Sequence, residues 1–185
     1  MGVSPGRMPS CTAMVQGIAL RPAGRPDRPA ILRTVRAAFT SDGHDAQDEV
    51  DIVEAIWTRD AALDGLDLVA IRNKEVVGHV LASWGDLAGW PVAGIAPLAV
   101  RPQDQGSGVG SALMQEVIRR GDLARLPLLF LLGDPGYYRR FGFEPSSTHG
   151  AWYSQGGFGD PHFMLRRLSA FTDCPEGEYH YAWEQ

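Results

Sequence analysis

The chain has 185 residues, a formal net charge of −5 at pH 7, and a composition in which 44% of residues are hydrophobic and 9% are aromatic. This length suits one domain with a substantial buried core and is too short for two. The acidic balance argues against a nucleic-acid partner, because phosphate binding requires clustered Lys and Arg.

Residues 1–16 are predicted to form a disordered tail, followed by one domain over residues 17–185. Gly2, Pro5 and Pro9 interrupt any regular structure in this segment, and no hydrophobic period appears. The segment lacks the apolar core of a signal peptide, and no stretch approaches the roughly 20 apolar residues of a membrane-spanning helix. We therefore expect a cytoplasmic protein with no membrane partner, whose synthesis starts at Met1 or alternatively at Met8 or Met14.

The two cysteines, Cys11 and Cys174, show neither the C-x-x-C nor the Cys/His spacing of a structural zinc site. The sequence therefore predicts no metal cofactor. Reduced thiols are expected, since cytosolic proteins rarely keep disulfides, with a disulfide between the two cysteines as the alternative.

Hydrophobic periodicity predicts the elements in the first half of the chain. After a strand at 18–21, Asp27 is expected to cap a helix whose apolar residues from Ile31 to Phe39 recur every 3.6 positions. A second amphipathic helix covers 50–57. β-Branched residues at 66–72 and 75–84 then predict an antiparallel hairpin around a turn at Asn73 and Lys74.

The second half continues with a strand at 94–100, a helix at 109–120 that Gly121 is expected to end, and a buried strand at 128–132. This order predicts a mixed α/β fold, in which helices pack on both faces of a mostly antiparallel sheet. The last residues, 176–185, are expected to form an edge strand that could pair across a homodimer interface. Aromatic and histidine side chains that could wall an acceptor pocket are Trp84, Trp90, Trp152, Tyr153, Phe158 and His162.

A glycine-rich loop links the strand that ends at Val100 to the next helix. Gly106, Gly108 and Gly110 let the main chain approach a ligand, and the helix N terminus offers free N–H groups and a positive dipole end. A pyrophosphate suits such a site; the alternative is that the glycines only make a tight turn. A P-loop requires Lys followed by Ser or Thr after the glycines, and this sequence has no such pair there. The dinucleotide-binding fingerprint does not fit either.

Two segments resemble the GNAT N-acetyltransferases. The run Leu98-Ala-Val-Arg-Pro102, followed by Gln105-x-x-Gly108-x-Gly110, is similar to the acetyl-CoA motif of that family. The segment Leu131-Leu-Gly-Asp-Pro-Gly-Tyr-Tyr-Arg-Arg-Phe-Gly-Phe143 is similar to its late strand and short helix, in wording closest to the YhbS-like branch. The resemblance covers roughly residues 18–168, and the two segments in this order are more specific than either alone.

The resemblance implies a GNAT-like domain in which a parallel pair of strands splays at an acetyl-CoA site. It implies direct transfer of an acetyl group from acetyl-CoA to a primary amine, which we expect to belong to a small molecule. Leu98 N–H would stabilise the oxyanion. Tyr138 would protonate the departing sulfur, for which a phenol pKa near 10 against a model thiol near 8.5 is suitable; the alternative for Tyr138 is packing on the sheet. The residues placed at the cofactor are Leu98, Ala99, Val100, Gln105, Gly106, Ser107, Gly108, Val109, Gly110, Ser111, Asp134, Tyr138 and Arg140.

Two features depart from the family pattern. Asp134-Pro135 replaces the usual Asn and Ala, which predicts a shorter helix with Asp134 as its N-cap. No glutamate lies on the strand before Pro97, where several members carry a base. An acyl-CoA-binding sensor without turnover and a protein-amine acetyltransferase therefore stay open as alternatives. The candidates for a base are Glu49, Glu54 and His79.

Overall fold

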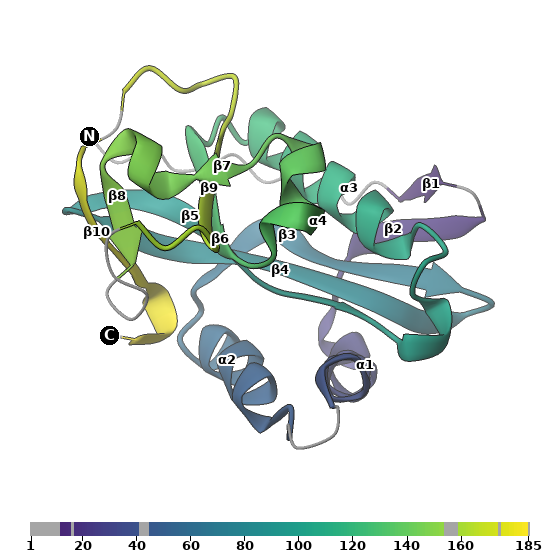
Figure 1. The fold of residues 1–185 in the computed structure, drawn as a ribbon. Helices are drawn as coiled ribbons and strands as arrows, with labels where there is room; N and C mark the ends of the chain where they lie inside the picture. Colours follow the sequence, from purple (N-terminus) through teal and green to yellow (C-terminus); the bar gives the residue numbers. More distant parts are fainter. Residues whose placement is uncertain (1–11, 16, 41–44, 154–158, 174, 185) are drawn as a thin grey trace.

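The computed structural model describes residues 12–15, 17–40, 45–153, 159–173 and 175–184, which form one mixed sheet with helices on both of its faces (Figure 1). The helices are α1 (Arg28–Phe39), α2 (Gln47–Thr58), α3 (Val109–Leu123) and the short α4 (Pro135–Tyr138). The strands are β1 (Ala13–Val15), β2 (Ile18–Pro22), β3 (Ala62–Arg72), β4 (Glu75–Leu87), β5 (Trp90–Val100), β6 (Leu128–Leu132), β7 (Glu144–Pro145), β8 (Ala151–Tyr153), β9 (Phe163–Arg167) and β10 (Gly177–Tyr181).

Most neighbouring strands of the sheet run antiparallel. The strand order is β1-β2-β3-β4-β5-β6-β9-β7, and β10 joins β4 to β8 off this path. The parallel pairs are β5 with β6 and β8 with β10. The pairing of β5 with β6 ends at Ile95 and Leu131, so the two strands separate beyond that point. This confirms the predicted fold class, including the parallel pair that splays.

Helices α1 and α2 cover one face of the sheet, and α3 and α4 cover the other (Figure 1). Val35 and Val53 pack with Leu81 on the α1–α2 side, whereas Leu113 and Val117 of α3 pack within a second apolar cluster on the opposite side. Successive side chains along a strand therefore point alternately into the two apolar layers, and both faces of the sheet are buried. The glycine-rich loop and α4 lie at the edge of the α3 layer, where β5 and β6 separate.

Several predicted elements are confirmed by the structure. Strand β6 has the predicted bounds, and β3 and β4 form the predicted hairpin. At its turn, Asn73 and Lys74 adopt positive φ angles of 51° and 66°. Asp134 caps α4, because its side chain accepts a hydrogen bond from Gly136 N–H at 2.8 Å, and Pro135 follows as the first helical residue.

Two predicted helix ends are wrong. Helix α3 continues through Gly121 to Leu123, because this glycine serves close packing: a Cβ there would lie 3.0 Å from Leu168. Asp27 precedes α1 but does not cap it. Its carboxylate instead pairs with Arg21 at 2.7 Å and accepts a hydrogen bond from Gly24 N–H. A tertiary contact thus outweighs the stop signal at Gly121, and a competing local contact occupies the Asp27 side chain.

The sequence predicted an edge strand at the C-terminal segment, and this prediction is wrong. Strand β10 pairs with β4 on one side and with β8 on the other, so both of its hydrogen-bonding edges are used. Tyr179 is fully buried and Tyr181 is 2% exposed. The bulk of these aromatic side chains drives the segment into the molecule, because their exposure would leave a large apolar area in water. This strand is therefore not available for pairing across a dimer interface.

Most of the predicted tail lies outside the described residues, as do Cys11 and Cys174. Within residues 1–16, Ala13–Val15 form β1 and pair antiparallel with β2, where the sequence predicted no regular structure. Edge pairing to β2 supplies the main-chain hydrogen bonds that this short segment could not make alone. Among the helices described, none is long and apolar enough to cross a membrane.

Candidate active site

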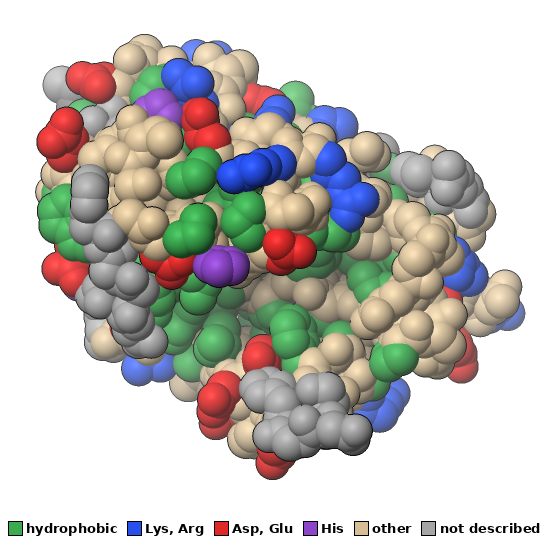
Figure 2. Space-filling view, in the orientation of Figure 1, with side chains coloured by type: hydrophobic (Ala, Val, Ile, Leu, Met, Phe, Trp, Pro, Cys, Tyr) green, Lys and Arg blue, Asp and Glu red, His purple; other side chains and the backbone are tan. Residues whose placement is uncertain are grey.

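A cleft of about 1220 Å³ opens where β5 and β6 separate. Its walls come from the end of β5, the glycine-rich loop, the β6–α4 connection, the facing sides of α1 and α2, and the C-terminal residues after β10. Figure 2 shows the molecule hollowed between the α4 region and the α1–α2 pair, with hydrophobic side chains in the hollow. A largely apolar cleft with a few converging polar groups is the usual form of a small-molecule site.

The main chain of β5 contains an extra residue at the cleft. In its pairing with β4, Ile95 faces Ala82 and Leu98 faces Val80, so three steps along β5 match two steps along β4. This is a β-bulge around Ala96 and Pro97, and a bulge bends the strand that carries it. The bulge lies just past the last β5–β6 pair, so bending of β5 accompanies the separation of the two strands.

Hydrogen-bond alternation shows which main-chain groups of β5 face the cleft. Arg101 N–H donates to Val77 O at 3.0 Å, and hydrogen-bonded pairs alternate with non-bonded pairs along an antiparallel ladder. The main-chain groups of Val100 and Leu98 therefore point away from β4, toward the gap left by β6. Gln105 agrees with this, because its side-chain amide donates to Val100 O at 3.1 Å. The main-chain groups of Ala99 point to β4 instead.

Helix α3 begins at the cleft with its N terminus uncapped. Gly108 is its N-cap with φ of 87°, and no side chain caps the helix. The first four N–H groups of a helix have no intrahelical partner, so they and the positive dipole end are available to an anion. Gly106 also has a positive φ, of 71°, and a Cβ there would meet nothing within 4 Å. The loop is therefore an open cradle with outward-facing donors.

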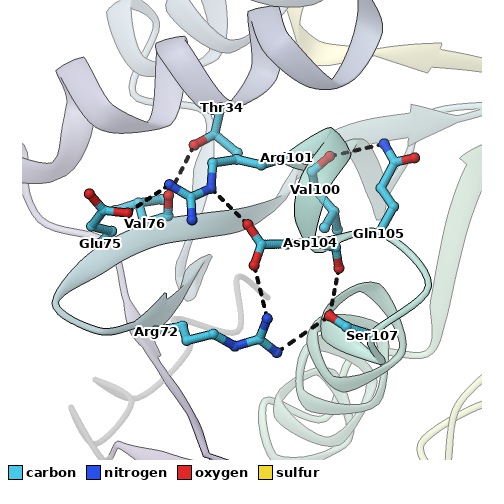
Figure 3. A network of polar contacts seen from close by, with 9 residues as sticks. All are labelled: Thr34, Arg72, Glu75, Val76, Val100, Arg101, Asp104, Gln105 and Ser107. Carbon is cyan, nitrogen blue, oxygen red and sulfur yellow. Dashed lines mark hydrogen bonds and ion pairs between the residues drawn. The ribbon is translucent and has the colours of Figure 1, made fainter.

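A buried carboxylate ties this loop to the sheet (Figure 3). Asp104 is 6% exposed and accepts hydrogen bonds from Arg72 and from Arg101, each at 2.9 Å. Arg72 reaches on to Ser107 Oγ at 3.3 Å, and that hydroxyl donates to Asp104 O at 2.6 Å. Arg101 also pairs with Glu75 at 2.9 Å. The network fixes the loop against β3 and β4. Sequence reasoning missed it because Arg72 and Glu75 are about 30 residues from the loop in the chain.

Two tyrosines of α4 form the wall opposite β5. The Tyr138 ring lies against Gly133, where a Cβ would overlap it, and edge-on to the Tyr137 ring at 4.9 Å between centroids. Burial raises the pKa of Tyr138, so its phenol stays protonated at neutral pH. The Tyr137 hydroxyl approaches Gly110, whose Cβ would lie 2.7 Å from it. The Arg140 guanidinium lies 4.0 Å from the Tyr137 ring centroid, a cation–π contact.

The C-terminal residues close the far end of the cleft, which sequence reasoning missed. The 3₁₀ helix Ala182–Glu184 follows β10, and the Glu184 carboxylate accepts hydrogen bonds from Tyr153 OH and from Tyr181 N–H, the latter at 2.9 Å. Trp183 stacks on Tyr181 with 4.0 Å between ring centroids. The alternating aromatic residues are a visible signal in the sequence, but by themselves they predict only an edge strand.

Comparison with known proteins fits this geometry. A family model described as an acetyltransferase (GNAT) domain matches residues 64–145. The uncharacterized N-acetyltransferase YhbS of Escherichia coli K12 is 33% identical over 129 residues, which are 66% of this chain and 71% of YhbS. The chain belongs to the GNAT acetyltransferases. The uncharacterized N-acetyltransferase YjhQ of the same strain is 38% identical over 101 residues, covering 52% of this chain and a little over half, 56%, of YjhQ.

Two solved GNAT structures match nearly the whole chain. A GNAT acetyltransferase from Brucella melitensis, in complex with acetyl-CoA, is 29% identical with a TM-score of 0.75 and covers 91% of this chain and 98% of its own. YhbS from E. coli, in complex with CoA, is 26% identical with a TM-score of 0.80 and covers 94% and 95%. These matches confirm the family and the fold that the two sequence signatures indicated.

The structure brings most of the residues that the GNAT signatures singled out into one cleft. Ala99, Ser107 and Val109 do not line it: the Ala99 and Val109 side chains are buried in the core, and Ser107 belongs to the Asp104 network. The residues that line it as expected are Leu98, Val100, Gln105, Gly106, Gly108, Gly110, Ser111, Asp134, Tyr138 and Arg140.

The candidate bases and pocket residues are more scattered. Glu49 lines the cleft, whereas Glu54 is exposed elsewhere on α2. His79 is fully buried and bonded to Asp67 at 2.8 Å, away from the cleft lining. Of the side chains expected to wall an acceptor pocket, Tyr153 lines the cleft, Trp84, Trp90, Trp152 and His162 do not, and Phe158 lies outside the described residues. In the part of the chain that the structure describes, no group of three or more His, Cys, Asp or Glu side chains could hold a metal ion.

Proposed function

We propose that the chain transfers an acetyl group from acetyl-CoA directly to a primary amine of a small molecule. The observation that carries the proposal is the gap between β5 and β6, into which the main-chain groups of Leu98 and Val100 point beside the uncapped N terminus of α3. The Brucella and E. coli relatives, whose structures contain acetyl-CoA and CoA, support it because their folds match over at least 91% of this chain.

In this proposal the pyrophosphate of acetyl-CoA rests on the loop from Gln105 to Ser111. The N–H groups and dipole of α3 stabilise its negative charge, as helix N termini do for phosphates generally. Arg140 lines the same part of the cleft and supplies a formal positive charge. The pantetheine arm runs along β5, where Leu98 and Val100 offer main-chain groups that β4 does not use.

Acetyl-CoA supplies an activated thioester, and the residues of the chain stabilise charge and move protons around it. In the proposed reaction Leu98 N–H donates to the oxyanion that forms when an amine attacks the carbonyl, the kind of contact that often contributes most to acyl transfer. Tyr138 donates a proton to the departing sulfur. The phenol is protonated at neutral pH, as an acid must be before it acts, and burial raises its pKa further.

The shape of the acceptor end supports a small molecule. Tyr153, Tyr181 and Trp183 wall the cleft there, and Ile52 of α2 faces it from another side. Such aromatic and apolar walls suit a small body that enters a pocket better than an extended peptide on a groove.

The first test is a calorimetric titration of the protein with acetyl-CoA, beside the variant Ser111→Glu. Ser111 lies in the first turn of α3 and lines the cleft. A glutamate there stabilises the helix through its dipole yet repels a pyrophosphate, so the fold is kept while affinity falls. We expect micromolar binding by the wild type, about −8 kcal/mol, and at least a tenfold loss in the variant.

The matched control is Gln115→Glu, which adds the same charge one turn later on an exposed position of α3. It should bind acetyl-CoA as the wild type does. Equal affinity of Ser111→Glu and Gln115→Glu would show that the loop does not hold the pyrophosphate. An absence of binding by the wild type would overturn the proposed function.

A further inference from the structure

The Glu184 carboxylate is held rigidly at the acceptor end of the cleft. Tyr153 OH donates to one of its oxygens, and Tyr181 N–H donates to the other at 2.9 Å. Both donors belong to the buried interior, since Tyr153 is 6% and Tyr181 2% exposed. Glu184 itself lines the cleft. A carboxylate fixed by two buried donors and facing a cleft is arranged to act on what enters that cleft.

Its anchor places this carboxylate beside the splay of β5 and β6. The Tyr181 ring lies over Gly94, where a Cβ would come within 2.8 Å of it. Gly94 is one residue before Ile95, the last residue of β5 that pairs with β6. Glu184 therefore approaches the reaction region from the side of β10, whereas Tyr138 approaches it from α4.

The proposed reaction needs a proton acceptor that β5 does not provide. Residues 90–97, which precede Leu98, include no ionisable side chain. An alkylamine resembles the Lys side chain, whose pKa is about 10.4, so nearly all of it is a protonated ammonium at pH 7 and has no lone pair for attack. Among the carboxylates lining the cleft, Asp134 is engaged in capping α4. Asp48 and Glu49 lie in the first turn of α2, and Glu184 is the carboxylate held by two buried donors.

We propose that Glu184 is the catalytic base and that the acceptor is a cationic primary amine on an aromatic or apolar body. This inference rests on the proposed acetyl transfer and names its base and its substrate class. The ammonium lies against Glu184, with the carboxylates of α2 adding to the attraction, and the apolar body lies on Trp183 and Ile52.

In this arrangement the ammonium loses two protons, one before and one after the C–N bond forms. Glu184 takes one proton from the ammonium and releases it to water, which frees the nitrogen lone pair. The lone pair forms the C–N bond, and the electron pair of the C–S bond leaves with the sulfur. The sulfur takes a proton from Tyr138, and the nitrogen gives up a second proton. That second proton returns to Tyr138 and restores its phenol. The products are an amide, a thiol and one proton in solution.

The test compares two nucleophiles by the release of free CoA thiol above the enzyme-free rate. The first, 2-phenylethylamine, is an ammonium at neutral pH. The second, hydroxylamine, is mostly uncharged and needs no base to expose its lone pair. Glu184→Gln keeps the size of the side chain and one acceptor oxygen for Tyr181 N–H, and its amide NH2 can donate to Tyr153 OH. In this variant we expect kcat for 2-phenylethylamine to fall about 100-fold. Turnover of hydroxylamine and affinity for acetyl-CoA should stay within about threefold of wild type.

The matched control is Glu178→Gln, the same change on β10 outside the cleft lining, which should leave both reactions unchanged. Tyr153→Phe removes one of the two donors to Glu184 and should give a smaller loss with 2-phenylethylamine. Thermal unfolding of each variant checks that the fold is kept.

The outcomes separate this inference from the function on which it rests. If kcat of Glu184→Gln falls equally with both nucleophiles, or falls with neither, the role of Glu184 is overturned and acetyl transfer is unaffected. Turnover of hydroxylamine alone by the wild type would overturn the cationic substrate class. Thiol release with neither nucleophile, despite binding of acetyl-CoA, would overturn the proposed transfer and this inference with it.

Discussion

At the scale of single residues, the two adjacent tyrosines of α4 take different places. The Tyr138 ring is packed between Gly133 and Phe143, whereas the Tyr137 hydroxyl reaches Gly110 at the start of α3. Burial raises the pKa of both phenols, and for Tyr137 the nearby Arg140 charge and a hydrogen bond with Ser111 oppose that effect. The two rings thus occupy different places, Tyr138 beside the β6–α4 connection and Tyr137 beside the start of α3, and the acid role proposed for Tyr138 can be tested separately from Tyr137.

We therefore expect Tyr138→Phe to lower kcat by about 100-fold, the lower range for loss of a general acid, with affinity for acetyl-CoA kept. The ring and its packing remain, so only the proton is lost. Thiol-release kinetics and calorimetry measure the two quantities separately. Tyr137→Phe, which keeps the acid, should cost much less in kcat. Unchanged turnover in Tyr138→Phe would remove the assigned acid.

At the scale of elements, the glycine-rich loop depends on a carboxylate that does not itself line the cleft. Asp104 bridges Arg72 at the end of β3 and Arg101 after β5, and is 6% exposed. Its two charge-assisted hydrogen bonds hold the loop where the N–H groups of α3 face the cleft. Loss of the Asp104 charge should therefore lower both the stability of the fold and the affinity for acetyl-CoA.

Asp104→Asn should lower the free energy of unfolding by about 3 kcal/mol, because two guanidinium groups lose a buried partner. Affinity for acetyl-CoA should fall by about fivefold, or roughly 1 kcal/mol, as the loop loosens. Denaturant unfolding and calorimetry test the two effects. The comparison variant is Glu75→Gln, whose exposed ion pair with Arg101 should contribute less than about 1 kcal/mol. A similar small effect in both variants would contradict the bridging role of Asp104.

At the scale of the whole molecule, the C-terminal strand is a part of the core. Tyr179 is fully buried, with ring centroids 4.8 Å from Phe130 and 5.3 Å from Phe163. This aromatic cluster joins β10 to β6 and β9, and Leu132 of β6 lines the cleft. The end of the chain therefore helps to build the site that it also lines.

Tyr179→Ala should lower the free energy of unfolding by about 3–5 kcal/mol, as expected for an aromatic side chain removed from a core. Urea denaturation measures this loss. Trp90→Ala provides the contrast, because Trp90 is 57% exposed and its removal should change stability by no more than about 0.5 kcal/mol. A small effect of Tyr179→Ala would mean that β10 is peripheral, as an edge strand would be.

The local parts of this fold could be predicted from the sequence. The hairpin around Asn73 and Lys74, the apolar strand β6, the loop that opens into α3 and the Asp134 cap each depend on residues that are neighbours in the chain. Patterns of this kind report local conformation directly, because turn, cap and alternation preferences act within a few residues. The two glycine-containing signatures lie in these same segments, so they sufficed to identify the family.

Only the tertiary structure decided which distant residues meet. It placed Glu184 in the cleft, surrounded Asp104 with two arginines, moved His79 away from the site, and turned the expected edge strand into an interior one. These outcomes depend on contacts between elements that are not neighbours in the chain, such as Arg72 with Asp104 and Tyr153 with Glu184. The periodicity of a short segment carries no information about such contacts. The chain itself thus determined a GNAT fold with a loop suited to a phosphate. The packing of its C-terminal segment decided that the Glu184 carboxylate lines the cleft.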